Sequence, residues 1–273
     1  MRVAALQYDI REDHAENLAT VEPYLREASE RGVELVLLPE MWAGSFPRSR
    51  SGCVEHAARD RASCDRLAGL SAELGLGLAG SALALEGERS LNRLELFEGG
   101  RSTWHYDKVH LFTPTAEQEV FDSGAAAPGV HASRGARLTG SICYDLRFPE
   151  LLRVPFRSGF DLALVCAQWP TARIGHWTAL CVARAVENQA FVLGCNRTGT
   201  AELGRKRRLL EFPGSSLVVS PYGEVLAGPL EEPGLVIADL DLEQTQSFRR
   251  RIPIARDERR DLYRDWLDAE EGS

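Results

Sequence analysis

Strand-like and helix-like segments alternate along this chain of 273 residues, and that alternation limits its possible folds more than any other feature. Apolar runs typical of strands cover residues 2–8, 33–38, 76–85, 93–97, 136–142, 162–167, 191–195, 216–220 and 235–239. Helical patterns cover residues 14–31, 59–74, 147–157, 171–188 and 256–267. This order predicts an α/β protein with largely buried sheets. By itself it suggests one open sheet. The last two strands are separated by a Pro-Tyr-Gly turn and no helix, so they are expected to form an antiparallel hairpin, which makes the sheet mixed.

The composition fits a globular protein with enough apolar material for one large domain, since 44% of the residues are hydrophobic and 26% are charged. The net charge of −8 argues against a nucleic-acid-binding surface, which needs a basic stripe. No apolar run approaches the length of a membrane span, and residues 1–8 are too short an apolar run for a signal peptide. The 6 cysteines are scattered without a Cys-x-x-Cys pair, which favours free thiols in a reducing compartment over disulfides or a zinc site. We therefore expect a cytoplasmic protein that binds neither nucleic acid nor membrane.

Cys143 lies where the strand 136–142 turns into a helix-like run, 146–157. The unpaired N–H groups and the dipole of a starting helix favour a thiolate and can hold a developing oxyanion. Catalytic nucleophiles are often placed in this way, so Cys143 is a candidate nucleophile. A free cysteine is also commonly a small buried hydrophobic residue, and this stretch alone fits both interpretations.

Glu40 and Lys108 are candidate partners of that cysteine. Glu40 follows the strand 33–38, at the sheet edge where α/β proteins build their sites, and its apolar neighbours Met41 and Trp42 would partly desolvate a general base. Lys108 is embedded among aromatic residues, and a fixed ammonium near Cys143 would lower the pKa of the thiol and stabilise charge on a substrate oxygen. The alternatives are an exposed carboxylate at a strand end and a surface lysine lying over its aromatic neighbours.

Several other residues are candidates for supporting roles. Glu117 is expected to brace the lysine or a substrate amine. Trp169 either forms a wall of the pocket or simply precedes a helix that begins with proline. Arg173 is a candidate for binding a substrate carboxylate. A histidine could pair with Cys143 as in a thiol protease, but His176 lies mid-helix beside a tryptophan and is expected to be a packing residue.

Glu40, Lys108 and Cys143, in this order and with their flanking residues, resemble the catalytic motifs of the carbon–nitrogen hydrolase (nitrilase) superfamily. The matching segments are Leu-Leu-Pro-Glu-Met, Tyr-Asp-Lys-Val-His-Leu-Phe and Ile-Cys-Tyr-Asp-Leu-Arg-Phe-Pro-Glu. The chain looks most like the ω-amidase branch of this superfamily. The segments that indicate this branch are Cys-Tyr-Asp-Leu-Arg-Phe, the pair His-Trp at 176–177 and a late Ile-Pro-Ile. The resemblance implies an α-β-β-α sandwich of two mixed sheets flanked by helices, in place of one open sheet. It also implies one domain over 1–263, a C-terminal tail over 264–273 and a homodimer.

The resemblance further implies a cysteine-dependent amidohydrolase. Glu40 would act as the base, Cys143 would form a thioester, and the oxyanion would lie between Lys108 and the backbone N–H of Tyr144. The implied substrate is a small ω-amide such as 2-oxoglutaramate or succinamate, cleaved to a carboxylate and ammonia without a metal or other cofactor. The same three residues would also suit an N-carbamoyl compound, a nitrile or a modified peptide. A hydrolase-like scaffold that only binds a partner is the non-enzymatic alternative.

Overall fold

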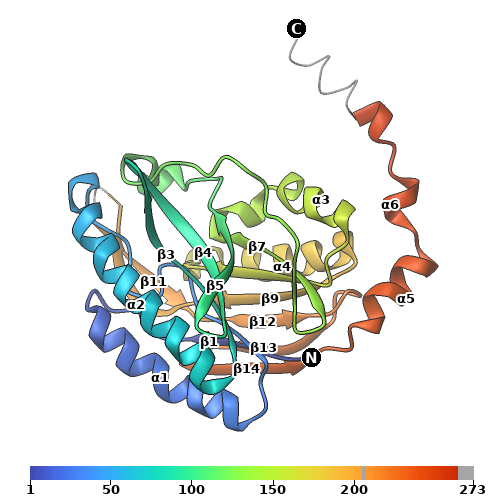
Figure 1. Ribbon diagram of the computed structural model, residues 1–273. Coiled ribbons are helices and arrows are strands. Elements are labelled where there is room, and N and C mark those ends of the chain that lie inside the picture. Colours follow the sequence, from blue (N-terminus) through green and yellow to red (C-terminus); the bar gives the residue numbers. More distant parts are fainter. Residues whose placement is uncertain (205–206, 264–273) are drawn as a thin grey trace, which may run out of the picture.

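The computed structural model describes residues 1–204 and 207–263 and contains two six-stranded mixed sheets packed face to face (Figure 1). The strand order of the first sheet is β14 (Gly234–Asp239), β1 (Arg2–Gln7), β2 (Leu35–Leu37), β3 (Gly77–Glu86), β4 (Arg89–Glu98) and β5 (Arg101–Asp107). That of the second is β13 (Val225–Leu230), β12 (Ser216–Val219), β9 (Phe191–Asn196), β8 (Leu162–Ala167), β7 (Ala136–Ile142) and β6 (His131–Ser133). A separate antiparallel pair consists of β10 (Thr198–Leu203) and β11 (Arg208–Pro213).

Helices cover the outer face of each sheet. α1 (His14–Glu30) and α2 (Cys53–Leu74) lie on the first sheet, whereas α3 (Pro149–Ser158) and α4 (Ile174–Asn188) lie on the second (Figure 1). Two further helices, α5 (Glu243–Arg251) and α6 (Ile254–Asp257), come near the C-terminus. Short 3-10 helices connect these elements, namely η1 (Arg50–Gly52), η2 (Thr113–Thr115), η3 (Glu117–Glu119), η4 (Cys143–Arg147) and η5 (Thr171–Arg173).

The alternation of side chains along β1 shows why four layers form. Val3 and Ala5 are buried between the two sheets, whereas Ala4 and Leu6 are buried under the helices of the first sheet. Because successive side chains of a strand point to opposite faces, a strand that is apolar throughout needs a partner on both faces. Two sheets of such strands bury both faces if they pack against each other and carry helices outside. The four-layer α-β-β-α arrangement is thereby confirmed, and the single open sheet suggested by the alternation alone is wrong.

The hairpin predicted from residues 216–220 and 235–239 is also wrong. β12 pairs antiparallel with β13, and β14 crosses to the other sheet and pairs antiparallel with β1. β13 was not recognised because Gly228 and Pro229 interrupt its apolar pattern, and proline is tolerated in a strand at the edge of a sheet.

The helix predicted over 256–267 is interrupted in the structure. α6 ends at Asp257, residues 258–259 are not helical, and residues 260–263 are helical again. α5, which contains a single apolar residue, was not expected. Residues 264–273, where the predicted tail lies, are outside the described part, so the boundary at residue 263 stays a prediction.

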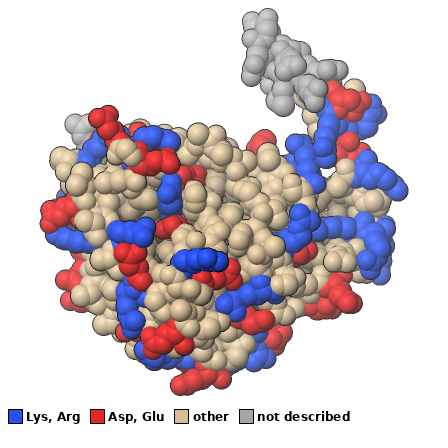
Figure 2. Space-filling view, viewed as in Figure 1, with Lys and Arg blue, Asp and Glu red and all other residues tan. Residues whose placement is uncertain are grey.

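On the face shown in Figure 2, acidic and basic side chains are interspersed, and basic ones gather over α5 and α6. Within the described ranges, no helix is long and apolar enough to cross a membrane.

Candidate active site

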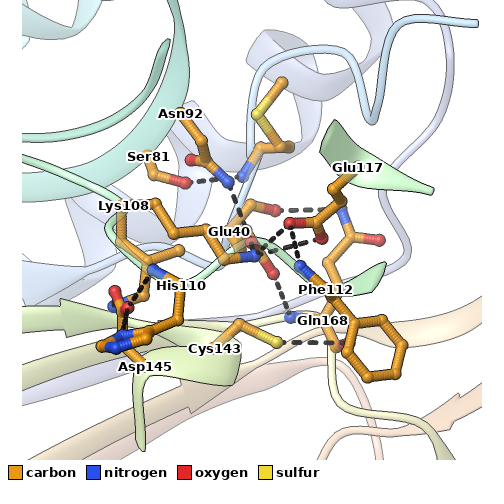
Figure 3. Close-up of polar contacts among 12 residues, drawn as sticks. Glu40, Ser81, Asn92, Lys108, His110, Phe112, Glu117, Cys143, Asp145 and Gln168 are labelled. Carbon is orange, nitrogen blue, oxygen red and sulfur yellow. Dashed lines mark hydrogen bonds and ion pairs between the residues drawn. The ribbon is translucent and has the colours of Figure 1, made fainter. Parts of the chain in front are cut away.

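Glu40, Lys108 and Cys143 all lie at or just beyond the carboxyl ends of strands, and the fold brings them together (Figure 3). Lys108 follows β5 and Glu40 follows β2, both in the first sheet, whereas Cys143 follows β7 in the second. Glu40 and Cys143 line one pocket, here called the cysteine pocket, with Phe46, Phe112, Thr115, Glu117, Tyr144, Arg147, Gln168, Trp169, Pro170, Arg173, Leu203 and Leu210. The site thus forms where the carboxyl ends of strands from the two sheets come together.

Lys108 is fully buried between two carboxylates. Its ammonium nitrogen lies 2.8 Å from Oε1 of Glu40 and 2.8 Å from Oε2 of Glu117. Burial alone would lower the pKa of Lys108, but Glu117 and Glu40 together raise that pKa well above its usual value. The lysine is therefore held as a cation, and the expected bracing role of Glu117 agrees with this geometry.

Each of the two carboxylates is fixed by further hydrogen bonds. The side-chain amide of Asn92 donates to Oε1 of Glu40 at 2.9 Å, and the backbone N–H of Gln168 donates to its Oε2 at 3.0 Å. The backbone N–H of Phe112 donates to Oε2 of Glu117 at 2.9 Å. Burial raises the pKa of Glu117, although Lys108 opposes this shift. These contacts leave the carboxylates little freedom to rotate.

Cys143 begins η4 with a positive backbone φ of 48°, a conformation that few non-glycine residues adopt and that is over-represented at functional sites. Its sulfur lies 3.8 Å from the backbone oxygen of Gln168. Burial, followed by the charge of Glu40, raises the pKa of the thiol well above its usual value, and Lys108 lowers it by less. This direction is opposite to the expected favoured thiolate, because the sulfur is desolvated beside a carboxylate, whereas Lys108 acts on the pKa in the expected direction.

Asp145 anchors the turn that carries the cysteine. Its carboxylate accepts hydrogen bonds from the hydroxyl of Tyr106 at 2.8 Å, the backbone N–H of His110 at 2.8 Å and the backbone N–H of Ile142 at 3.2 Å. The ring of His110 also lies 2.8 Å from this carboxylate and stacks on Phe148, with ring centroids 3.7 Å apart. His110 is thus engaged by Asp145 and supports the turn.

His176 is exposed on α4, so the expectation of a packing residue is wrong. Its Nδ1 lies 3.3 Å from the guanidinium of Arg147. The core-facing stripe of this helix instead contains Trp177, Cys181 and Ala185. One helical position therefore separates the buried tryptophan from the exposed histidine.

The other predicted residues, Tyr144, Trp169 and Arg173, all line the cysteine pocket. The indole N–H of Trp169 donates to the backbone oxygen of Arg173 at 2.8 Å, and the Arg173 guanidinium lies 5.6 Å from the ring centre of Phe112. Arg147, which was not predicted to bind substrate, lies over the ring of Trp169 at 4.8 Å. The pocket therefore has two guanidinium groups in its wall.

Asn92 and Gln168 were also missed. Asn92 lies within β4, and Gln168 follows β8, and both contact Glu40. Neither has a distinctive sequence context, whereas Arg147 belongs to the Cys-Tyr-Asp-Leu-Arg-Phe segment and could have been proposed from it.

Comparisons with known proteins agree with this geometry. Residues 2–250 match the family model described as "Carbon-nitrogen hydrolase". The chain is 32% identical to 2-oxoglutaramate amidase of Bacillus subtilis, over 96% of this chain and 98% of the relative. It is 35% identical to Omega-amidase YafV of Escherichia coli K12, over 86% of this chain and 87% of that protein.

Solved structures show the same fold. The chain superimposes on the amidase from Nesterenkonia sp. AN1 with a TM-score of 0.83 and 31% identity, covering 97% of this chain and 99% of that one. In that structure, of a glutamate-to-glutamine variant, acrylamide has added to the active-site cysteine. A carbon-nitrogen hydrolase from Helicobacter pylori G27 superimposes with a TM-score of 0.90 at 22% identity, covering 98% of each chain, which supports the fold alone. The chain therefore belongs to the carbon-nitrogen hydrolase family.

Proposed function

We propose that this protein hydrolyses a small amide by way of a thioester on Cys143. The observation that carries the proposal is the buried Glu40–Lys108 ion pair at 2.8 Å, with Glu40 in the same pocket as the sulfur of Cys143. A base, a nucleophile and a fixed cation in one enclosed site are the groups that acyl transfer needs.

The proposed reaction uses each group in turn. Glu40 takes the proton from the thiol as the sulfur attacks the amide carbon, and the oxyanion is held by the Lys108 ammonium and the Tyr144 backbone N–H. Collapse of this intermediate breaks the C–N bond, and Glu40 returns the proton to the departing ammonia. A water molecule then attacks the thioester carbon as Glu40 takes its proton. Collapse of the second intermediate releases the carboxylic acid product, and Glu40 returns its proton to the sulfur.

We propose an ω-amide of a small dicarboxylate as the substrate class. The support comes from the relatives named 2-oxoglutaramate amidase and Omega-amidase, and from Arg147 and Arg173 in the pocket wall. Guanidinium groups bind carboxylates well, so these two arginines suit the distal carboxylate of such a substrate. A neighbouring cavity of about 580 Å³ shares Phe46, Thr115, Glu117 and Leu203 with the cysteine pocket and offers a route of entry for a small molecule.

The test is ammonia release from succinamate, 2-oxoglutaramate, an N-carbamoyl amino acid and a small nitrile. We expect activity on the ω-amides, and none in a folded Cys143→Ala variant. Hydrolysis retained by that variant would contradict the thioester. Glu40→Gln should also be inactive and His176→Ala active; the reverse result would favour a cysteine–histidine mechanism.

We also propose a homodimer in the cytoplasm. A set of exposed apolar side chains on the outer face of the second sheet supports the dimer, namely Val186, Tyr222 and Ile252, which are 41%, 43% and 48% exposed. The six cysteines are free thiols, in keeping with a reducing compartment.

A further inference from the structure

A second cluster of chemically capable side chains lies on the outer side of the first sheet, away from Cys143. It consists of His14, the first residue of α1, together with His56 and Asp60 on α2. One ligand atom from each of these residues lies within 4.8 Å of the others. The proposed amidase reaction uses none of them.

The two imidazoles face the same carboxylate oxygen. Nε2 of His14 lies 2.8 Å from Oδ1 of Asp60, and Nε2 of His56 lies 3.6 Å from the same oxygen. Ligands bound at about 2.0–2.1 Å in a tetrahedron lie about 3.3 Å apart, so the two separations bracket the value for a tetrahedral metal. His56 and Asp60 are one helical turn apart, which places both on the same side of α2.

The hydrogen bonding of the cluster is incomplete. Nε2 of His56 is buried and has no hydrogen-bond partner among the described residues. His14 already occupies the nearest oxygen of Asp60, and the separation of 3.6 Å is too long for a second hydrogen bond to it. A buried ring nitrogen without a partner is costly, and a cation at the centre of the cluster would give it one.

The surrounding protein fixes these ligands in orientation. The other oxygen of Asp60 accepts the backbone N–H of Leu83 at 2.7 Å, and the Asp60 side chain is 1% exposed. His14 lies directly against Gly44, where an added Cβ would come within 2.2 Å of its Cε1. Metal ligands are normally held in this way by groups in a second layer. A cavity of about 220 Å³ borders His14 and His56, so a fourth position is accessible to water or a small ligand.

We propose that His14, His56 and Asp60 form a binding site for a divalent transition-metal ion of the zinc class. Two imidazoles and one carboxylate are a ligand set that suits Zn²⁺ and leaves one tetrahedral position open. The ion would link the start of α1 to α2. It would lie next to Gly44, which belongs to the loop between Glu40 and the pocket residue Phe46. Its role is to fasten the two helices and this loop, at a distance from the reacting atoms.

The experiment measures Zn²⁺ bound per chain after equilibrium dialysis, with Co²⁺ as a second probe whose visible absorption reports tetrahedral coordination. It uses the full chain with Cys143→Ala as background, so that the pocket thiol cannot bind the ion. We expect one ion per chain. His56→Gln and Asp60→Asn should each weaken binding by at least about 100-fold, since even loss of a supporting residue typically costs 10–100-fold. His105→Gln, an exposed histidine on β5, is the matched control and should bind as the background does.

Circular dichroism of the metal-free variants shows whether they fold, and a rise in thermal midpoint with Zn²⁺ should occur in the background and the control only. Absence of stoichiometric Zn²⁺ in the background protein would overturn the proposal. Equal Zn²⁺ affinity in folded His56→Gln and the background would also overturn it, because the ion would then be bound elsewhere.

Discussion

At the scale of single residues, the arrangement of Lys108 between Glu40 and Glu117 explains how three ionisable groups can be buried together. One cation shared by two carboxylates compensates part of the cost of removing all three from water. Removing one partner leaves the remaining buried charges uncompensated. The loss of folding free energy is then far larger than for breaking an exposed ion pair. In the proposed reaction, the same cation would stabilise the oxyanion.

Lys108→Met should therefore destabilise the protein by about 3–5 kcal/mol at neutral pH and abolish amide hydrolysis. Burial already raises the pKa of Glu117, and loss of the ammonium would raise it further, above its value in the unfolded chain. As the pH falls, the folded variant takes up a proton at Glu117 before the unfolded chain does, which stabilises the folded state. The destabilisation should therefore diminish as the pH falls. Urea unfolding at neutral and mildly acid pH measures this change in the free energy of unfolding.

The double variant Lys108→Met/Glu117→Gln should recover part of the stability at neutral pH, and no recovery would argue against the charge explanation.

A second prediction at this scale separates the nucleophile from its base. The charge of Glu40 contributes to the raised pKa of Cys143, so Glu40→Gln should lower the pKa of the thiol while it removes amide hydrolysis. The rate of alkylation by iodoacetamide should rise at a lower pH in this variant than in the unsubstituted protein. Mass spectrometry should place the adduct on Cys143, because the other five cysteines are buried.

Glu150→Gln is the control for that experiment, since Glu150 is an exposed carboxylate on α3 and should leave the alkylation profile unchanged. An unaltered profile in Glu40→Gln would mean that Glu40 does not act on the sulfur.

At the scale of elements, the site depends on how the ends of strands are held. Lys108 directly follows β5, and its backbone oxygen accepts the N–H of Gly124 at 2.8 Å. A Cβ at Gly124 would come within 2.2 Å of the backbone oxygen of Asp107, so this glycine permits a close approach of two chain segments. The loop that follows η3 is thus a support for the end of β5.

Gly124→Ala should for that reason shift the backbone at Lys108 and lower kcat by about 10²-fold, the size of effect expected for a 1 Å misplacement. Gly69→Ala is the matched control, because Gly69 lies in α2 with no atom within 4 Å of the added Cβ. That control should keep full activity and gain about 0.5–1 kcal/mol from the higher helix propensity of alanine. Equal kcat in both variants would show that Gly124 has no such supporting role.

At the scale of the whole molecule, apolar side chains remain exposed on the outer face of the second sheet. Val186 lies beside Gly223, Tyr222 stacks on Phe248 with ring centroids 4.5 Å apart, and the backbone oxygen of Ile252 accepts a hydrogen bond from the end of α4. These contacts connect the exposed residues across α4 and α5 into one surface. Apolar surfaces of this kind commonly mark interfaces, and a two-fold pair of chains would cover this one with its own copy.

Light scattering should accordingly give twice the mass of one chain. Val186→Arg should shift the protein toward the monomer, because a charge would be buried without a partner at the interface. Val54→Arg is the control, since Val54 is 70% exposed on α2, over the other sheet, and should leave the mass unchanged. A monomer mass for the unsubstituted chain at all concentrations would contradict the proposed dimer.

The sequence by itself determined the strands that are apolar throughout, the helices with clear stripes and the three residues Glu40, Lys108 and Cys143. These depend on local pattern and on short motifs, which a chain carries whatever its tertiary structure. The α5 helix, the edge strands β5, β6 and β13 and the separate pair β10–β11 escaped detection, because packing and edge position override weak local patterns.

Only the tertiary structure decided the hydrogen bonds from Asn92 and Gln168 to Glu40, the exposure of His176 and the approach of His14 to His56 and Asp60. Those contacts join segments far apart in the chain, and no local pattern records which of them will meet. The ionisation of Cys143 was decided there too, because the pKa of the thiol depends on burial and on the charges brought beside it.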